Sequence, residues 1–214
     1  QKAAQLGLSG LSFLSGIPGT IGGALKMNAG AYGREVVDCL ECLRGIDRDG
    51  NMHELSVDDM RYTYRHSAPD KQLIFVEAVF NATAGDPEII KAEIANIRTR
   101  REASQPIKEK TGGSTFANPS AADLQAAGLD PSWGAWRLID AVDGRGFAIG
   151  GAQMSEKHCN FMINAGDASA FDLECLGEEM RRRVFEKLGI TLRWEIRRIG
   201  RYGEGQAPLD NWID

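Results

Sequence analysis

The 214-residue sequence has few cysteines, few aromatic residues and no excess of basic charge. Its four cysteines include one CxxC, formed by Cys39 and Cys42, but no second CxxC and no histidine pair stands at the spacing of a zinc site. We therefore expect reduced, buried thiols and no metal site. The formal net charge of −5 argues against a nucleic-acid partner, because nucleic-acid binding favours a basic patch.

Long apolar segments and targeting signals are also missing. No run of about 18 apolar residues occurs, which excludes a helix that spans a membrane. The residues from Gln1 to Ala4 lack the pattern of a signal peptide. We therefore expect a cytoplasmic protein with no membrane partner. Its length predicts one or two domains with a sizeable core.

Glycine, in contrast, is concentrated in residues 16–33, which read GIPGTIGGALKMNAGAYG. Glycine permits positive φ and close approach of a ligand to the backbone. Successive N–H groups in such a loop form a surface suited to phosphate. The spacing is not that of a P-loop, and the strand–GxGxxG–helix context of a dinucleotide fold is missing. From these residues alone, a structural turn and an anion-binding loop both remain open.

Local patterns predict an α+β fold, because strands and helices follow one another in unequal order. Apolar, β-branched runs in the first half predict strands at residues 36–47, 52–57 and 73–82. Asp49-Gly50 is a typical hairpin turn between the first two strands. A helix is predicted from Pro87 to about Ser104, capped by Asp86.

Pro106 is predicted to begin the second part of the chain. A polar loop is expected at residues 108–114, and short strands within 147–163. Amphipathic patterns predict helices at residues 121–127, 135–142 and 167–188, the last with Gly189 as its C-cap. Alternating apolar and polar residues predict a strand at 191–199.

Three arginines, Arg98, Arg100 and Arg101, stand at the end of the helix at 87–104. Positive charge suits the C-terminal end of a helix dipole. Phosphate binding is an equally good interpretation of the same residues. The sequence leaves both open.

The stretch at 16–33 resembles the flavin-binding signature of the UDP-N-acetylenolpyruvoylglucosamine reductase (MurB) family. The resemblance extends from about Leu6 to about Gly200, and its further motifs come in the family's order: YRHS, GGSTFANP and GGAQMSEKHCNF. It implies an α+β fold in three parts. Residues 1–105 would belong to the FAD-binding region, residues 106–190 would form a smaller substrate-binding domain, and residues 191–214 would supply a final strand and a tail that return to the active site.

The resemblance also implies three catalytic residues: Arg65, Ser114 and Glu195. By position alone, each would be an ordinary surface or turn residue. Arg65 matches the family's catalytic arginine, whose charge suits a carboxylate or a developing enolate. Ser114 matches the proton donor, and Glu195 matches the catalytic glutamate of the C-terminal strand.

Binding residues follow from the same motifs. The implied FAD-binding residues are Ile17, Pro18, Gly19, Thr20, Gly22, Gly23, Asn28, Gly30, Ala31 and Gly33. The implied substrate-binding residues are Asn118, Arg145, Gln153 and His158. For His158, a positioning or structural role is favoured over that of a general base. Ala117 departs from the family, in which many members carry lysine at this position.

The activity implied is NADPH-dependent, FAD-dependent reduction of UDP-N-acetylglucosamine enolpyruvate to UDP-N-acetylmuramate, for synthesis of the peptidoglycan precursor. We expect a monomer whose partner is this small UDP-sugar substrate. Two alternatives remain: a UDP-sugar-binding fragment without redox activity, and a flavin oxidase of the same broad fold. Covalent attachment of flavin through His or Cys is disfavoured, because neither residue occurs in 16–33.

The family places a further N-terminal region ahead of the glycine-rich stretch, with additional flavin contacts. The chain is therefore expected to lack the N-terminal part of the family's FAD-binding region. We expect it to carry the catalytic residues and to retain FAD poorly by itself.

Overall fold

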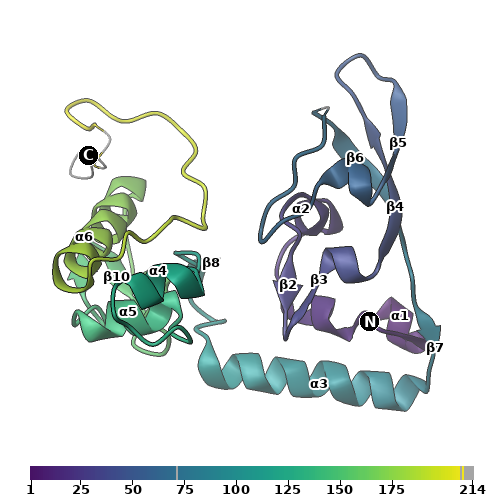
Figure 1. Cartoon of the computed structure of the whole chain (residues 1–214), viewed down its shortest axis with the longest axis horizontal. Helices are drawn as coiled ribbons and strands as arrows, with labels where there is room; N and C mark the ends of the chain where they lie inside the picture. The colour runs from purple at the N-terminus through teal and green to yellow at the C-terminus, as the bar shows by residue number, and fades with distance from the viewer. Residues whose placement is uncertain (71, 208, 210–214) are drawn as a thin grey trace. The chain divides into compact units, whose positions relative to one another are not determined.

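The computed structural model describes residues 1–70, 72–207 and 209 of the chain. It contains short strands and helices in irregular order, as Figure 1 shows, and confirms the predicted α+β class. The chain divides into two units, residues 1–101 and 102–214. No helix among the described residues is long and apolar enough to cross a membrane.

The first unit is built around a three-stranded antiparallel sheet in the order β5-β4-β6. Its elements are α1 (Lys2–Gln5), β1 (Leu8–Ser9), η1 (Ser12–Gly16), α2 (Ile21–Lys26), β2 (Gly30–Ala31), β3 (Arg34–Glu35), η2 (Val36–Asp38), β4 (Leu40–Ile46), β5 (Met52–Ser56), η3 (Asp58–Met60), β6 (Ile74–Phe80), β7 (Thr83–Ala84) and α3 (Pro87–Ser104), which continues into residues 102–104. One face of the sheet packs on α2, where Leu25, Leu43 and Met60 are fully buried.

The hairpin and the strands predicted at 52–57 and 73–82 are confirmed, but the strand predicted at 36–47 begins only at Leu40. Residues Val36–Asp38 form η2 instead, because Asp38 accepts from the N–H of Glu35 at 2.7 Å and closes a turn there. In the β4–β5 turn, Asp47 Oδ1 accepts hydrogen bonds from the N–H groups of Asp49 and Asn51, both at 2.9 Å. Gly50 takes a φ of +85°, which other residues rarely adopt. The helix at 87–104 is also confirmed, because Asp86 accepts from the N–H of Glu88 at 2.8 Å and α3 begins at Pro87.

A two-residue ladder joins β1 to β7, with Leu8 opposite Ala84. Next to it, the N–H of Gly85 donates to the carbonyl of Gly7 at 2.8 Å. A side chain at Gly7 would bring a Cβ to 2.8 Å from the Gly85 carbonyl oxygen, and Gly7 has a φ of +65°. The ladder therefore requires glycine at position 7.

Tyr62 packs on the core of the first unit, and its buried hydroxyl has no hydrogen-bond partner among the residues that the structure describes. Burial raises the pKa of Tyr62 to about 12. Because removal of an unsatisfied buried group relieves its desolvation cost, we expect Tyr62→Phe to raise the free energy of unfolding by about 1 kcal/mol.

The pH dependence of this effect has a definite sign. The folded state favours the protonated phenol, so its contribution is complete below the unfolded pKa of about 10 and is lost as the pH rises towards 12. The advantage of Tyr62→Phe over the unsubstituted chain should therefore grow above about pH 10, as measured by urea unfolding. Tyr64→Phe is the control, because Tyr64 is exposed. Equal free energies of unfolding for Tyr62→Phe and the parent, both at neutral pH and above about pH 10, would contradict the prediction.

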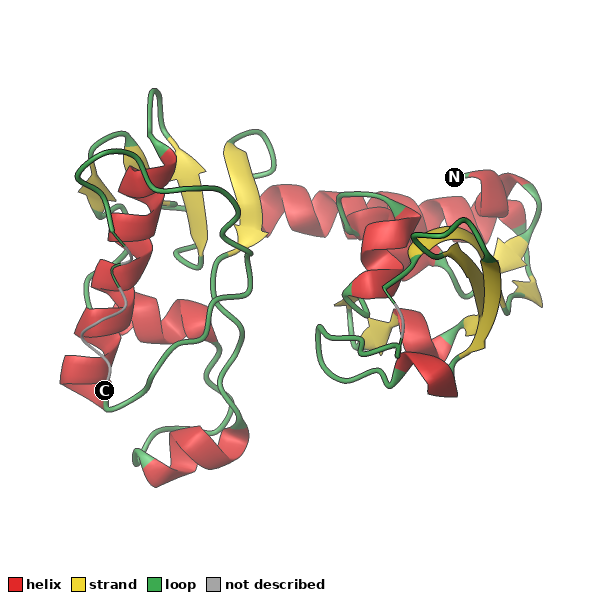
Figure 2. Cartoon of the chain, turned by 90° about the horizontal axis from the view of Figure 1, so that it is seen from above, coloured by secondary structure: helices red, strands yellow, loops and turns green. Residues whose placement is uncertain are grey.

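The second unit contains a four-stranded antiparallel sheet in the order β8-β11-β10-β9. Its elements are β8 (Lys110–Ser114), α4 (Ala121–Ala126), α5 (Ala135–Ala141), β9 (Ala148–Ile149), β10 (Ala152–Met154), β11 (Phe161–Asn164) and α6 (Ala170–Leu188). In Figure 2, α6 lies beside the strands of this sheet, and it contacts β9, β10 and β11. The core lies between them, with Leu138, Met154 and Met180 fully buried.

The ends of α6 follow local signals in the sequence. Ser169 caps its start by accepting from the N–H of Asp172 at 3.0 Å, and Asp172 returns a bond to the N–H of Ser169 at 2.8 Å. Gly189 ends the helix with a φ of +69° and confirms the predicted C-cap. Leu176, Met180 and Val184 are buried, as the amphipathic pattern predicts.

Two predictions for this unit were wrong. The polar loop expected at 108–114 contains β8, which pairs with β11 at the edge of the sheet although it lacks apolar alternation. The strand expected at 191–199 is absent, and a single bridge joins Trp194 to Phe116. The partner segment continues into α4, which Ser120 caps, and no further bridge joins it to the described residues 191–199.

All four cysteines are free. Cys39 and Cys159 are buried, whereas Cys42 and Cys175 are partly exposed. Burial raises the pKa of Cys159 to about 11. The expectation of reduced, buried thiols therefore holds for Cys39 but only in part for Cys42.

Candidate functional site

The glycine-rich segment, residues 16–33, runs from the end of η1 through α2 to β2 and the turn after it. Thr20 caps α2, since its Oγ1 accepts from the N–H of Gly23 at 3.1 Å. Gly19 has a φ of +115°. Most of the predicted FAD-binding residues are at least partly exposed: Ile17, Pro18, Gly19, Thr20, Gly22, Gly23, Gly30, Ala31 and Gly33. Their backbone is therefore accessible to a ligand.

Asn28 differs from the other predicted FAD-binding residues, because only 1% of it is exposed. Its Nδ2 donates to Glu35 Oε2 at 2.7 Å and to the Thr63 carbonyl at 3.2 Å, and its Oδ1 accepts from the N–H of Val37 at 3.1 Å. Both polar atoms of the side chain thus bind within the protein. Asn28 shapes the segment from inside.

Arg65 is held directly on the glycine-rich segment. Its Nη2 donates to the carbonyl of Gly30 at 2.8 Å, and its Nη1 donates to Glu35 Oε1 at 3.0 Å. The guanidinium also lies over the ring of Tyr64, with its central carbon 4.6 Å from the ring centroid. Arg65 itself takes a φ of +53°. These contacts fix a positive charge at the segment, with a half-buried side chain.

Gly30 makes this approach possible. A Cβ at position 30 would lie 2.6 Å from the carbonyl oxygen of Arg34 and 2.9 Å from Nη1 of Arg65. Both distances are shorter than real Cβ atoms show. The backbone of Arg34 therefore requires glycine at position 30, and a side chain there would also displace the guanidinium of Arg65.

Arg101 is a second cation beside the segment, and the sequence left its role open. Arg101 packs against Gly16: a Cβ added at Gly16 would lie 3.1 Å from the Cδ of Arg101. The side chain of Tyr32 is also close enough to interact electrostatically with the guanidinium. Burial lowers the pKa of Arg101, because the guanidinium loses water. Among the described residues, it makes no hydrogen bond or ion pair. A half-buried charge in this state favours an anionic ligand.

In the second unit, the structure brings Ser114 and Glu195 together. Ser114 ends β8, and the carbonyl of the next residue, Thr115, accepts from the N–H of Glu195 at 2.8 Å. Both residues are partly exposed. Ser114 Oγ has no hydrogen-bond partner among the described residues. Its proton is therefore available to a ligand at this place.

Two of the four predicted substrate-binding residues hold the local structure. Asn118 Oδ1 accepts from the N–H of Ala135 at 2.9 Å, at the start of α5. Arg145 pairs with Asp140 at 2.8 Å and donates to the Glu156 carbonyl at 2.5 Å. The hydrogen bond to Asp140 raises the pKa of Arg145. A substrate contact would use the remaining exposed part of each side chain.

His158 is half-buried, and its Nδ1 accepts from the N–H of Asn160 at 3.3 Å. Its ring meets Phe161 edge-on, with the centroids 4.8 Å apart. Burial, together with the charge of Arg145, lowers the pKa of His158. A neutral ring with Nδ1 as an acceptor fits a positioning role and leaves Nε2–H as a donor.

Gln153 lines a groove of about 530 Å³ in the second unit, together with Gln105 and Lys157. Its Nε2 donates to the Gly146 carbonyl at 3.1 Å. Gln105 Oε1 is buried and has no donor among the described residues. Sequence reasoning did not single out Gln105 or this groove. No group of three metal-ligating side chains occurs in the part of the chain that the structure describes.

Two family models match the chain. One, described as an FAD binding domain, matches residues 1–56, and the other, described as the C-terminal domain of UDP-N-acetylenolpyruvoylglucosamine reductase, matches residues 105–199. With the α+β fold and the glycine-rich segment, these matches define the class: a segment similar to an FAD binding domain, followed by a segment similar to the C-terminal domain of this reductase family. The chain belongs to the UDP-N-acetylenolpyruvoylglucosamine reductase family.

Relatives and a solved structure agree with this assignment. The chain is 54% identical over 200 residues to the UDP-N-acetylenolpyruvoylglucosamine reductase of Azorhizobium caulinodans, covering 94% of the chain and 61% of the relative. The enzyme of that name from Caulobacter vibrioides is 50% identical over 205 residues, covering 95% and 64%. The crystal structure of the Thermus caldophilus reductase has a TM-score of 0.75 at 35% identity, covering 92% of this chain and 66% of that one. The chain thus spans about three-fifths of the length of its curated relatives.

Proposed function

We propose that the chain carries the catalytic residues of an FAD-dependent reductase that uses NADPH to convert UDP-N-acetylglucosamine enolpyruvate to UDP-N-acetylmuramate, in the cytoplasm, for peptidoglycan precursor synthesis. The observation that supports the proposal is the hydrogen bond from Glu195 N–H to the carbonyl of Thr115, the residue that follows Ser114. Family membership supplies the substrate class. Residues 1–105 would bind FAD and residues 106–190 the substrate.

The residues of the first unit fit a flavin dinucleotide. An accessible glycine-rich backbone suits a diphosphate, and the half-buried charge of Arg101 lies beside it. When bound, FAD supplies the hydride chemistry, with NADPH as the reductant. The chain's own residues bind, orient and move protons.

Each catalytic residue has a separate task in this proposal. Arg65 provides a fixed positive charge for the substrate carboxylate as it becomes enolate-like. Glu195 hydrogen-bonds the same developing charge in its protonated form. Ser114 donates its hydroxyl proton to C2 of the enolpyruvyl group. Because a serine hydroxyl is a weak acid, this step requires a strongly basic carbon and stabilisation of the resulting alkoxide.

The proposal is tested by the visible absorption spectrum of the chain, with any natural sequence that precedes Gln1, after addition of FAD. NADPH should bleach the flavin, and the enolpyruvyl substrate should restore its colour. Reoxidation by oxygen but not by substrate would favour a flavin oxidase. Binding of the UDP-sugar without bleaching would favour a non-redox binding module. The same titration on residues 1–214 alone tests the expected poor retention of FAD.

Arg101 gives a prediction for cofactor binding. Loss of a charge-assisted contact to a diphosphate costs roughly 1.5–3 kcal/mol, so Arg101→Ala should weaken FAD binding by at least about tenfold. Arg100→Ala is the matched control, because Arg100 is exposed on the same turn of α3. The measurement is a fluorescence titration with FAD of the chain together with any natural sequence that precedes Gln1. Equal affinities for the two variants would remove Arg101 from the site.

A further inference from the structure

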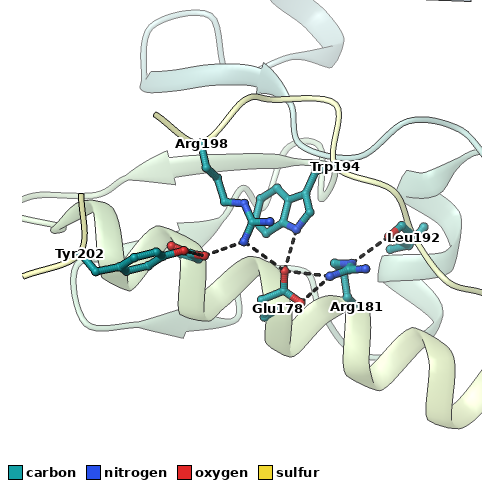
Figure 3. A network of polar contacts seen from close by, with 7 residues as sticks. Glu178, Arg181, Leu192, Trp194, Arg198 and Tyr202 are labelled. Atoms are coloured by element: carbon teal, nitrogen blue, oxygen red, sulfur yellow. Dashed lines mark hydrogen bonds and ion pairs between the residues drawn. The ribbon is translucent and has the colours of Figure 1, made fainter. Parts of the chain in front are cut away.

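Glu178 of α6 is the centre of a buried polar network in the second unit, which Figure 3 shows. Only 4% of Glu178 is exposed. Its Oε1 accepts from Trp194 Nε1 at 2.7 Å, and its carboxylate pairs with Arg181 at 2.6 Å. Arg181 Nε in turn donates to the Leu192 carbonyl at 2.8 Å. The network therefore fastens α6 to the segment that contains Glu195.

The indole of Trp194 also packs directly against α6, at Gly177. A Cβ at Gly177 would collide with Cη2 of the indole, so glycine is required where the ring crosses the helix. The ring also contacts Phe116, with the centroids 5.0 Å apart, and Arg198 lies over it at 5.1 Å. These contacts and one directed hydrogen bond restrict the orientation of the indole.

Side chains alternate along residues 192–198. Leu192, Trp194 and Ile196 pack on the core cluster of this unit, so Glu195 lies between two anchored neighbours. Arg198, further along, pairs with Glu174 at 2.5 Å and approaches Glu178 at 3.7 Å. The segment has no strand ladder, and its only bridge is at Trp194 within the described chain. In place of a ladder, backbone hydrogen bonds to residues 115–117 hold the segment on one side, and side-chain contacts hold it to α6.

We propose that Glu178 is a positioning residue for Glu195. By holding the indole of Trp194 and the guanidinium of Arg181, it fixes residues 192–196 against α6 and so sets the place and direction of the Glu195 carboxyl beside Ser114. The inference rests on the proposed function, in which Glu195 acts on the substrate. The buried pair of Glu178 and Arg181 on α6 thereby contributes to catalysis, a role that the sequence motifs do not indicate.

The test separates two half-reactions in the FAD-loaded protein, with any natural sequence that precedes Gln1. Glu178→Ala should slow reoxidation of the flavin by the enolpyruvyl substrate by about tenfold or more, because small displacements of a catalytic group are costly. Reduction by NADPH should stay within about twofold, because Glu195 has no part in it. Glu178→Gln, which keeps an acceptor for the indole N–H, should recover most of the rate.

A second readout follows the network itself. The indole ¹⁵N–¹H resonance of Trp194 should be protected from solvent exchange in the parent protein and exposed in Glu178→Ala. Glu179→Ala is the matched control, since Glu179 is the next residue of α6 and pairs with Arg182 and Arg183. If Glu178→Ala does not fold, Trp194→Phe removes the same hydrogen bond and keeps a smaller aromatic ring at this position.

The outcomes are distinct. A parent protein that substrate cannot reoxidise would overturn the proposed function and this inference with it. A competent parent, with a Glu178→Ala variant that exposes the indole yet reoxidises at the parental rate, would overturn the inference alone. Equal slowing of both half-reactions would also overturn it, because a general loss of structure would then explain the defect.

Discussion

Ser114→Ala is expected to stop substrate reduction almost completely while the protein still binds FAD and accepts hydride from NADPH. A positioned acid contributes about 10² to 10⁴ in rate. The rate of flavin reoxidation by substrate should therefore fall by that factor. Ser114 is the natural candidate because it is partly exposed at the end of β8, next to the residue that binds Glu195.

Stopped-flow absorbance measures the two half-reactions separately. Ser132→Ala is the control, because Ser132 is an exposed serine of the same unit whose hydroxyl donates to Asp130. In deuterated solvent, the parent should place deuterium at C2 of the product. A Ser114→Ala variant that reoxidises as fast as the parent would assign the proton to another donor.

The second large effect is on stability. Arg181→Ala should lower the free energy of unfolding by about 3–5 kcal/mol, since it removes a partner from a buried carboxylate and leaves the Leu192 carbonyl without its donor. Only 9% of Arg181 and 4% of Glu178 are exposed. A charge left in such a place has little access to water.

Arg182→Ala is the comparison on the next residue of the helix. Arg182 pairs with Glu179 and Glu186 on an exposed face, where such pairs contribute less than about 1 kcal/mol. Urea unfolding followed by tryptophan fluorescence reports on this unit, because the tryptophans that the structure describes lie in it. Similar decreases in the free energy of unfolding for the two variants would show that the buried pair of Arg181 stabilises the protein no more than an exposed pair does.

The elements that the sequence predicted well have local causes. Pro87 with its Asp86 cap starts α3, and Gly189 in a left-handed conformation ends α6. The Asp47 turn likewise joins β4 to β5 through contacts between near neighbours. Such signals act within a few residues and are therefore legible without the fold.

The elements that the sequence missed depend on distant partners. β8 is a strand because it pairs with β11, although Lys110 and its two glycines have no strand pattern. The stretch at 191–199 has the alternation of a strand, but among the described residues a single bridge, between Trp194 and Phe116, pairs it with a neighbour. The inferred roles of Arg101, Glu178 and Gly177 depend on contacts with residues distant in the sequence, so no local sequence pattern predicts them.

The ladder between β1 and β7 has a consequence for the order in which the chain acquires structure. It joins residues near the start of the first unit to residues just before α3, so its closure costs far more chain entropy than the β4–β5 hairpin. Local hairpins form in microseconds, whereas distant pairings come late. On the ribosome, β1 must wait until Ala84 has emerged, and the β4–β5 hairpin folds before the ends of the unit can meet.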